Sequence, residues 1–519
     1  MVLGTGRVSV AADTMAPSPD RARRRRLTLA PALAFAAMAL TRPPLGPDAV
    51  APASAQPEPR PAPKAGSGAL RAAVEALNEK VRKLGGTLGV AIVDVASGEP
   101  LAGFQEHKPL NPASVSKIMT AAAALALLHP NYRYQTVLYG DQKGANVGSL
   151  VLRGTGDPSL ETSDLWGLAR DLKEAGVRRV DGDVGVDQRF FDDLYVPPAY
   201  EQQPNEWAPF RAPVSALSLN ENTVTMLVRP ATKGASALVS FDPPGYVDVE
   251  GAVKTVEEGA AQNVGLQLTP AGARLSAKVS GGVPEGARPL RFTKRADSPA
   301  LLGGYALKAL LAQAGITVGG DVKPAGDARG RALAEHASRP LSSLLYELGK
   351  QSNNFYAEMV FKSLALEKKG RGAKAEQSAE IVTRYLTELG AWDEGMVIKN
   401  GSGLFDANRA SAAALAKLLR QAYRNPAYGS EFVAQLAIGG VDGTLRHRFR
   451  GEKFKGAVRA KTGTLEGTAA LAGYAMGGPG QAPIAFAIVI NDIAGKVGEA
   501  RPAIDACVES IVEQLATKP

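Results

Sequence analysis

Ser114 and Lys117, three positions apart, are the side chains in this 519-residue chain best suited to covalent chemistry. Pro112 precedes them and an apolar run follows, so we expect a buried helix that begins here, with Ser114 in its first turn. Residues three apart share a helix face, which lets the lysine amine reach the serine hydroxyl. Free N–H groups at a helix start add partial positive charge around Ser114. A serine beside a lysine that is held neutral predicts acyl transfer.

Two later motifs strengthen this interpretation. A Ser-x-x-Lys tetrad alone is weak evidence, because a helix cap followed by a surface lysine has the same letters. Ser352-Asn353-Asn354 interrupts two helical patterns, and Lys461-Thr462-Gly463-Thr464 precedes a strand rich in glycine and alanine. In this order, Ser-x-x-Lys, Ser-x-Asn and Lys-Thr-Gly form the motif set of the penicillin-interacting serine acyl-transferases.

The two ends of the chain have similar patterns that would position these motifs. Near the start, Leu70–Leu84 has helical periodicity and is followed by a predicted strand at Leu88–Val95. Near the end, predicted strands at Thr468–Met476 and Ile484–Ile490 are followed by a helix at Ala500–Leu515. This arrangement indicates that both ends of the chain contribute to one sheet.

The middle of the chain alternates short β-like runs with turns, and contains few helical patterns. We therefore expect a catalytic domain in two parts, residues 67–132 and 293–519, with a large, mostly β inserted region at residues 133–292. Two or three domains also suit the length of the chain.

The composition is that of a globular protein, with 45% hydrophobic and 21% charged residues. The single cysteine, Cys507, excludes an internal disulfide, and its apolar neighbours place it on the buried face of a C-terminal helix. The four histidines have no metal-ligand spacing, so neither a metal nor a cofactor is expected. A net charge of +9 without a basic stripe argues against a nucleic-acid partner and suits an acidic polymer.

The first 55 residues are predicted to be a secretory signal peptide. The basic run Arg21–Arg26 precedes the apolar segment Leu27–Leu40, which is too short to cross a membrane comfortably. Ala53-Ser54-Ala55 offers a small-residue cleavage site. A start at Met15 would give a signal of more usual length. Residues 56–66, which belong to a segment dense in proline and alanine, are predicted to form a flexible tether.

Further segments carry a resemblance to a known family. They are Gly154-Thr155-Gly156-Asp157-Pro158, Leu217–Asn222, Asn400-Gly401-Ser402-Gly403-Leu404 and Gly440–Leu445. With them the chain resembles the penicillin-binding protein 4 type D-alanyl-D-alanine carboxypeptidases/endopeptidases, which are low-molecular-mass class C penicillin-binding proteins. The 235 positions between Lys117 and Ser352 match the wide gap of that family. The resemblance implies an α+β fold of the serine β-lactamase/transpeptidase type, an antiparallel sheet with helices on both faces.

The resemblance also implies a role for each motif residue. Ser114 would attack the penultimate D-alanine carbonyl of a wall peptide, Lys117 would take its proton, and Ser352 would relay a proton to the leaving amine. The backbone N–H groups of Ser114 and Thr464 would form the oxyanion hole. The substrate-binding positions that it implies are Asn354, Lys461, Thr462, Gly463 and Thr464.

The implied function is a serine-type D-alanyl-D-alanine carboxypeptidase/endopeptidase acting on peptidoglycan stem peptides and cross-links. β-Lactam antibiotics would inhibit it covalently at Ser114. The expected location is the periplasm or another extracytoplasmic, wall-associated compartment, and peripheral association with the membrane stays open. The balance between the two peptidase activities also stays open, because both would use one site.

Two competing functions are weighed against this one. A β-lactamase or esterase on the same fold would need fast deacylation, and no Glu-x-x-Leu-Asn segment of the class A type follows Lys117 closely. A catalytically degenerate wall-binding protein is the second, and the intact motif residues argue against it.

Several positions receive a structural interpretation. Asn353 and Asn400 stand where the family commonly has aspartate, and we expect little loss at Asn353. Ser116 either holds Lys117 or lies on the helix surface, and Ser402 has no evident base beside it. Asp157 and Asp442 are predicted to form turns.

Overall fold

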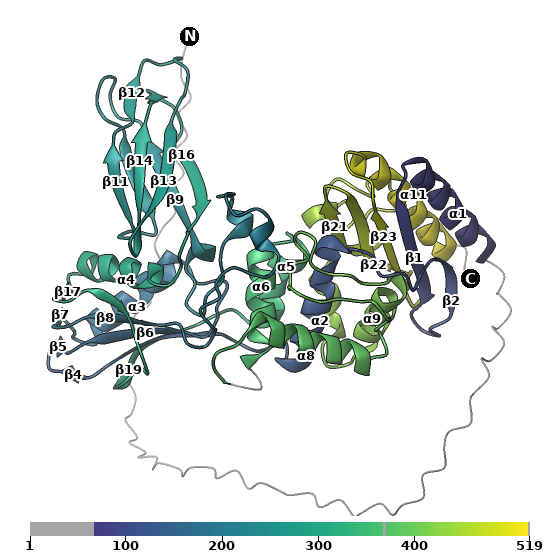
Figure 1. Ribbon diagram of the computed structural model, residues 1–519, viewed down its shortest axis with the longest axis horizontal. Helices are drawn as coiled ribbons and strands as arrows, with labels where there is room; N and C mark the ends of the chain where they lie inside the picture. Colours follow the sequence, from purple (N-terminus) through teal and green to yellow (C-terminus); the bar gives the residue numbers. More distant parts are fainter. Residues whose placement is uncertain (1–66, 367–369, 517–519) are drawn as a thin grey trace, which may run out of the picture. The chain divides into compact units, whose positions relative to one another are not determined.

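The computed structural model describes residues 67–366 and 370–516 (Figure 1). The predicted signal peptide and the tether before residue 67 lie outside these residues. Among the described residues, no helix combines the length and apolar character needed to cross a membrane.

A six-stranded antiparallel sheet joins the two ends of the chain, in the order β2-β1-β23-β22-β21-β20. Its strands are β1 (Thr87–Asp94), β2 (Pro100–Phe104), β20 (Ala437–Ile438), β21 (Val458–Leu465), β22 (Thr468–Ala475) and β23 (Ile484–Asn491). β1 pairs with β23 along its whole length, from Thr87 opposite Asn491 to Asp94 opposite Ile484. The prediction that both ends share one sheet is confirmed.

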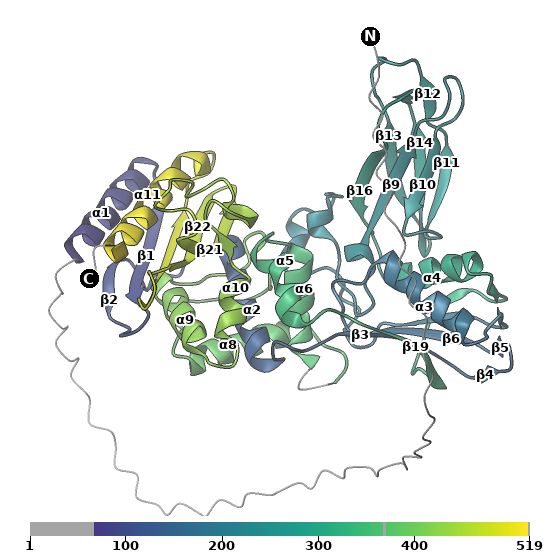
Figure 2. The same ribbon diagram turned by 180° about the vertical axis from the view of Figure 1, so that it is seen from behind.

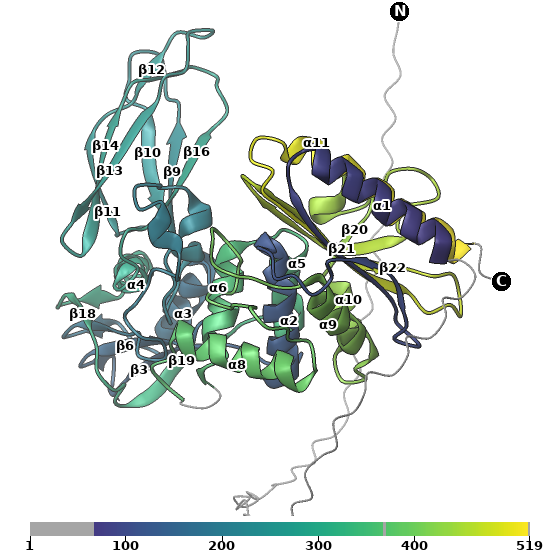
Figure 3. The ribbon, with the colours of Figure 1, turned by 45° about the vertical axis from the view of Figure 1, so that its right-hand side comes forward.

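Helices α1 (Ser67–Lys83) and α11 (Val497–Ala516) lie side by side on one face of this sheet (Figure 3). α1 buries Leu70, Val74, Leu77 and Val81, whose spacing of three and four residues places them on a single stripe. Cys507 on α11 is buried in the same cluster, as predicted.

A helical layer covers the opposite face (Figure 2). Its members are α2 (Lys117–Leu127), α5 (Leu341–Gly349), α6 (Asn354–Ser363), α8 (Ala375–Glu388), α9 (Ala412–Arg424) and α10 (Gly429–Ala434). α2 is buried from Lys117 through Leu125, which explains why its sequence is apolar on every side. Every residue of β22 is likewise buried, because helices cover both faces of the sheet. The predicted fold, an antiparallel sheet between two layers of helices, is confirmed.

The inserted region contains five smaller sheets and two helices, α3 (Thr162–Glu174) and α4 (Leu302–Gln313). Two of the sheets, β18-β8-β6-β3-β19 and β17-β7-β5-β4, share an apolar core with these helices. Their strands are β3 (Gln135–Gly140), β4 (Gln142–Lys143), β5 (Asn146–Val147), β6 (Leu150–Gly154), β7 (Arg179–Val180), β8 (Val184–Asp187), β17 (Thr317–Val318), β18 (Val322–Pro324) and β19 (Arg331–Ala337).

The other three sheets are β10-β9-β16, β11-β14-β13 and β12-β15, which enclose a small apolar cluster of their own. Their strands are β9 (Thr223–Arg229), β10 (Leu238–Asp242), β11 (Val247–Gly251), β12 (Lys254–Val256), β13 (Gly265–Ala271), β14 (Arg274–Ser280), β15 (Gly282–Pro284) and β16 (Leu290–Arg295).

Residues after 292 still belong to these sheets. β17 pairs with β7, β18 with β8, and β19 with β3, so α4 and the three strands that follow it close the inserted region. We therefore set the end of the inserted region near Ser338, instead of at residue 292. The local sequence pattern does not reveal this end, because strands that pair across more than a hundred residues leave no local signal.

Candidate active site

Ser114 lies in η1 (Ala113–Ser116), a 3-10 turn that runs directly into α2. The sequence predicted that Ser114 lies in the first turn of the α-helix, but the structure places it just before that helix. Ala113 has a φ of +47°, a strained value for alanine, and its N–H donates to Asn111 Oδ1 at 2.9 Å. Asn111 is itself fixed to the end of β23, because its N–H donates to Asn491 Oδ1 at 2.7 Å. The turn that carries Ser114 is thus anchored to the central sheet.

Lys117 is fully buried, and its Nζ lies within hydrogen-bond distance of three oxygens. These are Ser114 Oγ at 3.0 Å, Asn354 Oδ1 at 2.8 Å and the Ser402 carbonyl at 2.7 Å. Burial lowers the pKa of Lys117 to about 7, and the charge of Glu358 partly opposes this effect. Near neutral pH a large share of Lys117 is therefore neutral and able to accept the Ser114 proton.

Lys461 and Ser352 form a second amine–hydroxyl pair in the same site. Lys461 is fully buried in β21, and its Nζ donates to Ser352 Oγ at 2.8 Å and to the Thr462 carbonyl at 2.9 Å. Burial, and then the charge of Lys117, hold the pKa of Lys461 well below its ordinary value. Ser352 lies between α5 and α6 with a φ of +60°, a strained value for a serine.

Two glycines let backbone segments press against the Ser114 turn. A Cβ on Gly463 of β21 would lie 2.4 Å from the Pro112 carbonyl oxygen. A Cβ on Gly403, whose φ is +71°, would lie 1.9 Å from the Ala113 carbonyl oxygen. Because real Cβ atoms do not approach oxygen this closely, only glycine allows both approaches.

The remaining predicted positions, Thr462 and Thr464, flank Gly463 on β21. Thr462 donates to Thr444 Oγ1 at 3.0 Å, and Thr464 Oγ1 accepts from Arg501 Nη2 at 3.2 Å. The structure thus joins Ser114 and Asn354 through Lys117, and Ser352 to Lys461. The other three predicted positions follow Lys461 on β21, where Gly463 lies against the turn that carries Ser114. Arg501, at the start of α11, adds a cation beside Thr464 that the sequence did not single out.

The inserted region contributes to this site. Asn354 Nδ2 donates to the carbonyl of Phe210 in η3 (Pro209–Arg211) at 3.3 Å. Asn353 caps α6 through Oδ1, which accepts from the Tyr356 N–H at 3.2 Å, and its Nδ2 donates to Glu221 Oε2 at 3.0 Å. An aspartate at position 353 would set a second carboxylate against Glu221. The asparagine in this motif is therefore complementary to a residue of the inserted region.

The structure refines the interpretation of the other polar residues. Ser116 is buried, so the interpretation as a surface serine is wrong. Asn400 is structural: its Oδ1 accepts from the Gly403 N–H at 2.9 Å. Asp157 and Asp442 accept backbone N–H groups two and four residues away, as expected of turn formers.

Two buried groups near Lys117 were missed from the sequence. Glu358 accepts the N–H groups of Gly401 and Ser402, and the Tyr200 hydroxyl lies 3.2 Å from Ser402 Oγ. A signal for Glu358 existed, because it is an acid on an otherwise apolar stretch of helix one turn after Asn354. Tyr200 comes from the inserted region and had no motif around it.

The chain is similar to several known proteins over most of its length. A family model described as the D-Ala-D-Ala carboxypeptidase 3 (S13) family matches residues 70–511. The chain is 34% identical to a D-alanyl-D-alanine carboxypeptidase of Actinomadura sp. (strain R39), over 86% of this chain and 84% of that protein. It is 25% identical to the D-alanyl-D-alanine carboxypeptidase DacB of Haemophilus influenzae, over 78% of this chain and 86% of that protein.

A solved structure shows the same fold. Penicillin-binding protein 4 (dacB) from Haemophilus influenzae superposes with a TM-score of 0.69 at 23% identity, covering 85% of this chain and 99% of that one. A second structure of that protein is a complex with a β-lactam. The family match extends over most of the chain and includes the Ser114, Ser352 and Lys461 motifs, so this protein belongs to the D-Ala-D-Ala carboxypeptidase 3 (S13) family of serine-type peptidases.

Proposed function

We propose that this protein hydrolyses peptidoglycan peptides ending in D-alanyl-D-alanine, and the matching cross-links, through an ester on Ser114. The observation that carries the proposal is the contact of Lys117 Nζ with Ser114 Oγ at 3.0 Å, in a site where burial lowers the pKa of the lysine to about 7. A serine hydroxyl is a weak nucleophile unless a nearby base takes its proton. Among the described residues, Lys117 is the base in contact with it.

The reaction takes two steps. Ser114 Oγ attacks the carbonyl carbon of the penultimate D-alanine while Lys117 Nζ accepts the hydroxyl proton. The C–N bond then breaks, and the leaving amine takes a proton that Ser352 passes on from the lysine pair. Water next attacks the ester carbon and gives a proton to Lys117. The bond between Ser114 Oγ and this carbon then breaks, Lys117 returns the proton to Oγ, and the shortened peptide leaves as a carboxylic acid.

Substrate binding is assigned to β21 and Asn354. The terminal carboxylate of the substrate lies along Lys461, Thr462 and Thr464, with Gly463 allowing close approach to the strand. The side-chain amide of Asn354 hydrogen-bonds the peptide backbone of the substrate through its N–H group, while its Oδ1 accepts from Lys117 Nζ. The proton that the lysine pair retains, on Lys461, supplies positive charge where the substrate is negative.

A β-lactam would acylate Ser114 in the first step of this reaction, but the second step, hydrolysis of the ester, would not follow. Ser114 would open the ring by breaking its amide C–N bond, and the ring nitrogen, still tethered, would take the proton. Because no fragment leaves, the nitrogen keeps its place in the site and blocks the approach of water. The β-lactam complex of the Haemophilus influenzae relative supports this extension.

We place this activity outside the cytoplasm, where the wall substrate is. The support is the predicted signal peptide in residues 1–55, together with the D-alanyl-D-alanine carboxypeptidase activity named for the relatives.

The test is a time course of intact mass after mixing the mature protein with benzylpenicillin, with Ser114→Ala as the control. We expect a long-lived gain of one whole drug molecule on the wild type and none on the control. In parallel, release of D-alanine from a synthetic D-alanyl-D-alanine peptide should require Ser114. A transient adduct with rapid drug turnover would indicate a β-lactamase instead, and no adduct with no D-alanine release would contradict the proposal.

A further inference from the structure

Glu358 is a buried carboxylate one turn after Asn354 on α6, with only 3% of its surface exposed. Its Oε2 accepts the Gly401 N–H at 3.0 Å and its Oε1 accepts the Ser402 N–H at 2.8 Å. Two consecutive backbone donors on one carboxylate hold this segment in a fixed orientation. An acid of this burial requires such partners, because an unpaired buried charge is strongly unfavourable.

The segment held by Glu358 faces the Ser114 helix with its carbonyls. The Ser402 carbonyl accepts from Lys117 Nζ at 2.7 Å, and the Gly401 carbonyl accepts from Thr120 Oγ1 at 2.9 Å. Residues 401 and 402 are therefore held between α6 and α2. Their N–H groups donate to the Glu358 carboxylate, and their carbonyls accept from side chains of α2, the helix that carries Lys117. A change at Glu358 would be transmitted to the lysine through a single peptide segment.

We propose that Glu358 is a positioning residue for Lys117: its carboxylate fixes the Ser402 carbonyl against the lysine amine and places a negative charge near it. The proposal rests on the proposed roles of Ser114 and Lys117. It assigns to α6 a part in catalysis beyond presenting Asn354.

The charged and titratable groups around Glu358 and Lys117 support the proposal. Burial lowers the pKa of Lys117, and the charge of Glu358 raises it. Burial raises the pKa of Glu358, while the hydrogen bonds from residues 401 and 402 and the charge of Lys117 lower it and favour the carboxylate. Burial, and then the charge of Lys117, lower the pKa of Lys461. On the other side, Tyr200 and Ser402 face Glu358: burial, then the carboxylate, raise the pKa of Tyr200 well above its ordinary value. Tyr200 therefore stays a neutral phenol and adds no competing charge.

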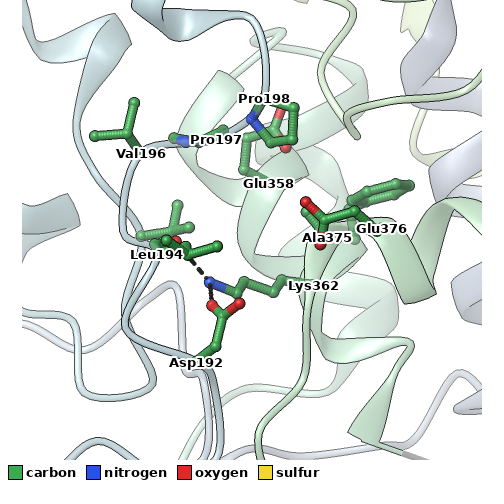
Figure 4. Close-up of a pocket in the computed structure, with 11 residues that line it drawn as sticks. Asp192, Leu194, Val196, Pro197, Pro198, Glu358, Lys362, Ala375 and Glu376 are labelled. Atoms are coloured by element: carbon green, nitrogen blue, oxygen red, sulfur yellow. Dashed lines mark hydrogen bonds and ion pairs between the residues drawn. The ribbon is translucent and has the colours of Figure 1, made fainter.

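The far side of Glu358 borders a cavity between the 192–198 segment of the inserted region and helices α6 and α8 (Figure 4). Lys362, on the same helix as Glu358, pairs there with Asp192 and donates to the Leu194 carbonyl at 2.9 Å. Glu376 lines the same cavity but is exposed. It supplies a matched control, an acid beside Glu358 that does not hold residues 401 and 402.

The test compares the pH profile of acylation by benzylpenicillin in the wild type, Glu358→Gln, Glu358→Asp and Glu376→Gln. In Glu358→Gln we expect the plateau rate to fall about 10- to 100-fold, because the lysine is misplaced. We also expect its acid limb to move to lower pH by about one unit, because the charge that favours protonated Lys117 is gone. Glu358→Asp should keep the limb near its wild-type position with a reduced plateau, and Glu376→Gln should match the wild type.

The position of the limb does not depend on how much protein is active, so partial unfolding of a variant leaves the comparison intact. A reduced plateau with an unmoved limb in Glu358→Gln would mean a purely structural role and would overturn the proposal. If Glu358→Gln does not fold, Glu358→Asp decides, and a plateau equal to that of the wild type would overturn it. Failure of the wild type to be acylated at Ser114 would instead refute the proposed function.

Discussion

At the residue scale, two buried lysines govern the protonation chemistry of the site. Lys117 and Lys461 are both fully buried, and each makes its hydrogen bonds to oxygens of the site. Two ammonium ions in one low-dielectric site repel each other, which favours loss of a proton from one of them. The pair is thus suited to take a proton from Ser114 and to return it elsewhere.

The first prediction concerns pH. Lys117 must be neutral to act as a base, and burial lowers its pKa to about 7. The rate of acylation by benzylpenicillin should therefore rise with pH through a limb centred near pH 7. An acylation rate that stays constant from pH 5 to pH 9 would contradict the role of Lys117 as base.

The second prediction separates charge from basicity. Lys117→Arg keeps a cation, but a guanidinium does not lose its proton in proteins. Acylation should fall by about 10²- to 10⁴-fold, the usual contribution of a general base, while the protein stays folded by circular dichroism. Acylation at the wild-type rate would show that the positive charge alone is sufficient.

At the element scale, the site depends on how closely β21 approaches the Ser114 turn. The third prediction is that Gly463→Ala forces these segments apart, since its Cβ would lie 2.4 Å from the Pro112 carbonyl. Acylation should fall by at least tenfold, with a destabilisation of about 1–3 kcal/mol. Gly467→Ala, in the following turn, is the matched control, because its nearest neighbour would be 3.7 Å away. Equal behaviour of the two variants in acylation and thermal melting would refute the close-approach argument.

The fourth prediction concerns the junction between α6 and the inserted region. Asn353→Asp should destabilise the protein by about 1–3 kcal/mol, because a carboxylate replaces the amide that donates to Glu221. Burial raises the pKa of Glu221, so the loss should be larger at pH 8, where both acids are charged, than at pH 5. Adding Glu221→Gln restores a donor and should recover most of the stability in denaturant titrations. A double variant no more stable than Asn353→Asp would argue against a direct contact.

At the scale of the whole molecule, burial of Lys117 links stability to pH. The pKa of Lys117 is about 7 in the folded protein and about 10.4 in an unfolded chain. Between these values the unfolded chain binds more protons, so the free energy of unfolding rises with pH across this window. The fifth prediction is that the wild type gains about 2 kcal/mol more than Lys117→Met between pH 7 and pH 9. Parallel pH dependence of the two proteins in denaturant titrations would contradict it.

The inserted region belongs to this scale as well, because it reaches the site through several contacts. Phe210 accepts from Asn354, Glu221 accepts from Asn353, and Tyr200 lies against Ser402. These residues come from separate turns of the insert, and of the three only Glu221 lies in a segment, Leu217–Asn222, that the sequence had singled out. Their positions depend on sheets whose strands pair across long stretches of chain.

The sequence by itself determined the shared sheet of the two chain ends, and it predicted the Ser114–Lys117 pair and the other motif residues of the proposed site. It could do so because short spacings on helices and strands fix which side chains are neighbours, as for Ser114 and Lys117. Only the tertiary structure decided the 3-10 turn at Ser114 and the extent of the inserted region. It alone also showed which residues Glu358, Tyr200 and Glu221 contact. These depend on burial and on contacts between distant segments, and neither the depressed pKa of Lys117 nor the clamp on residues 401 and 402 exists until those segments pack together.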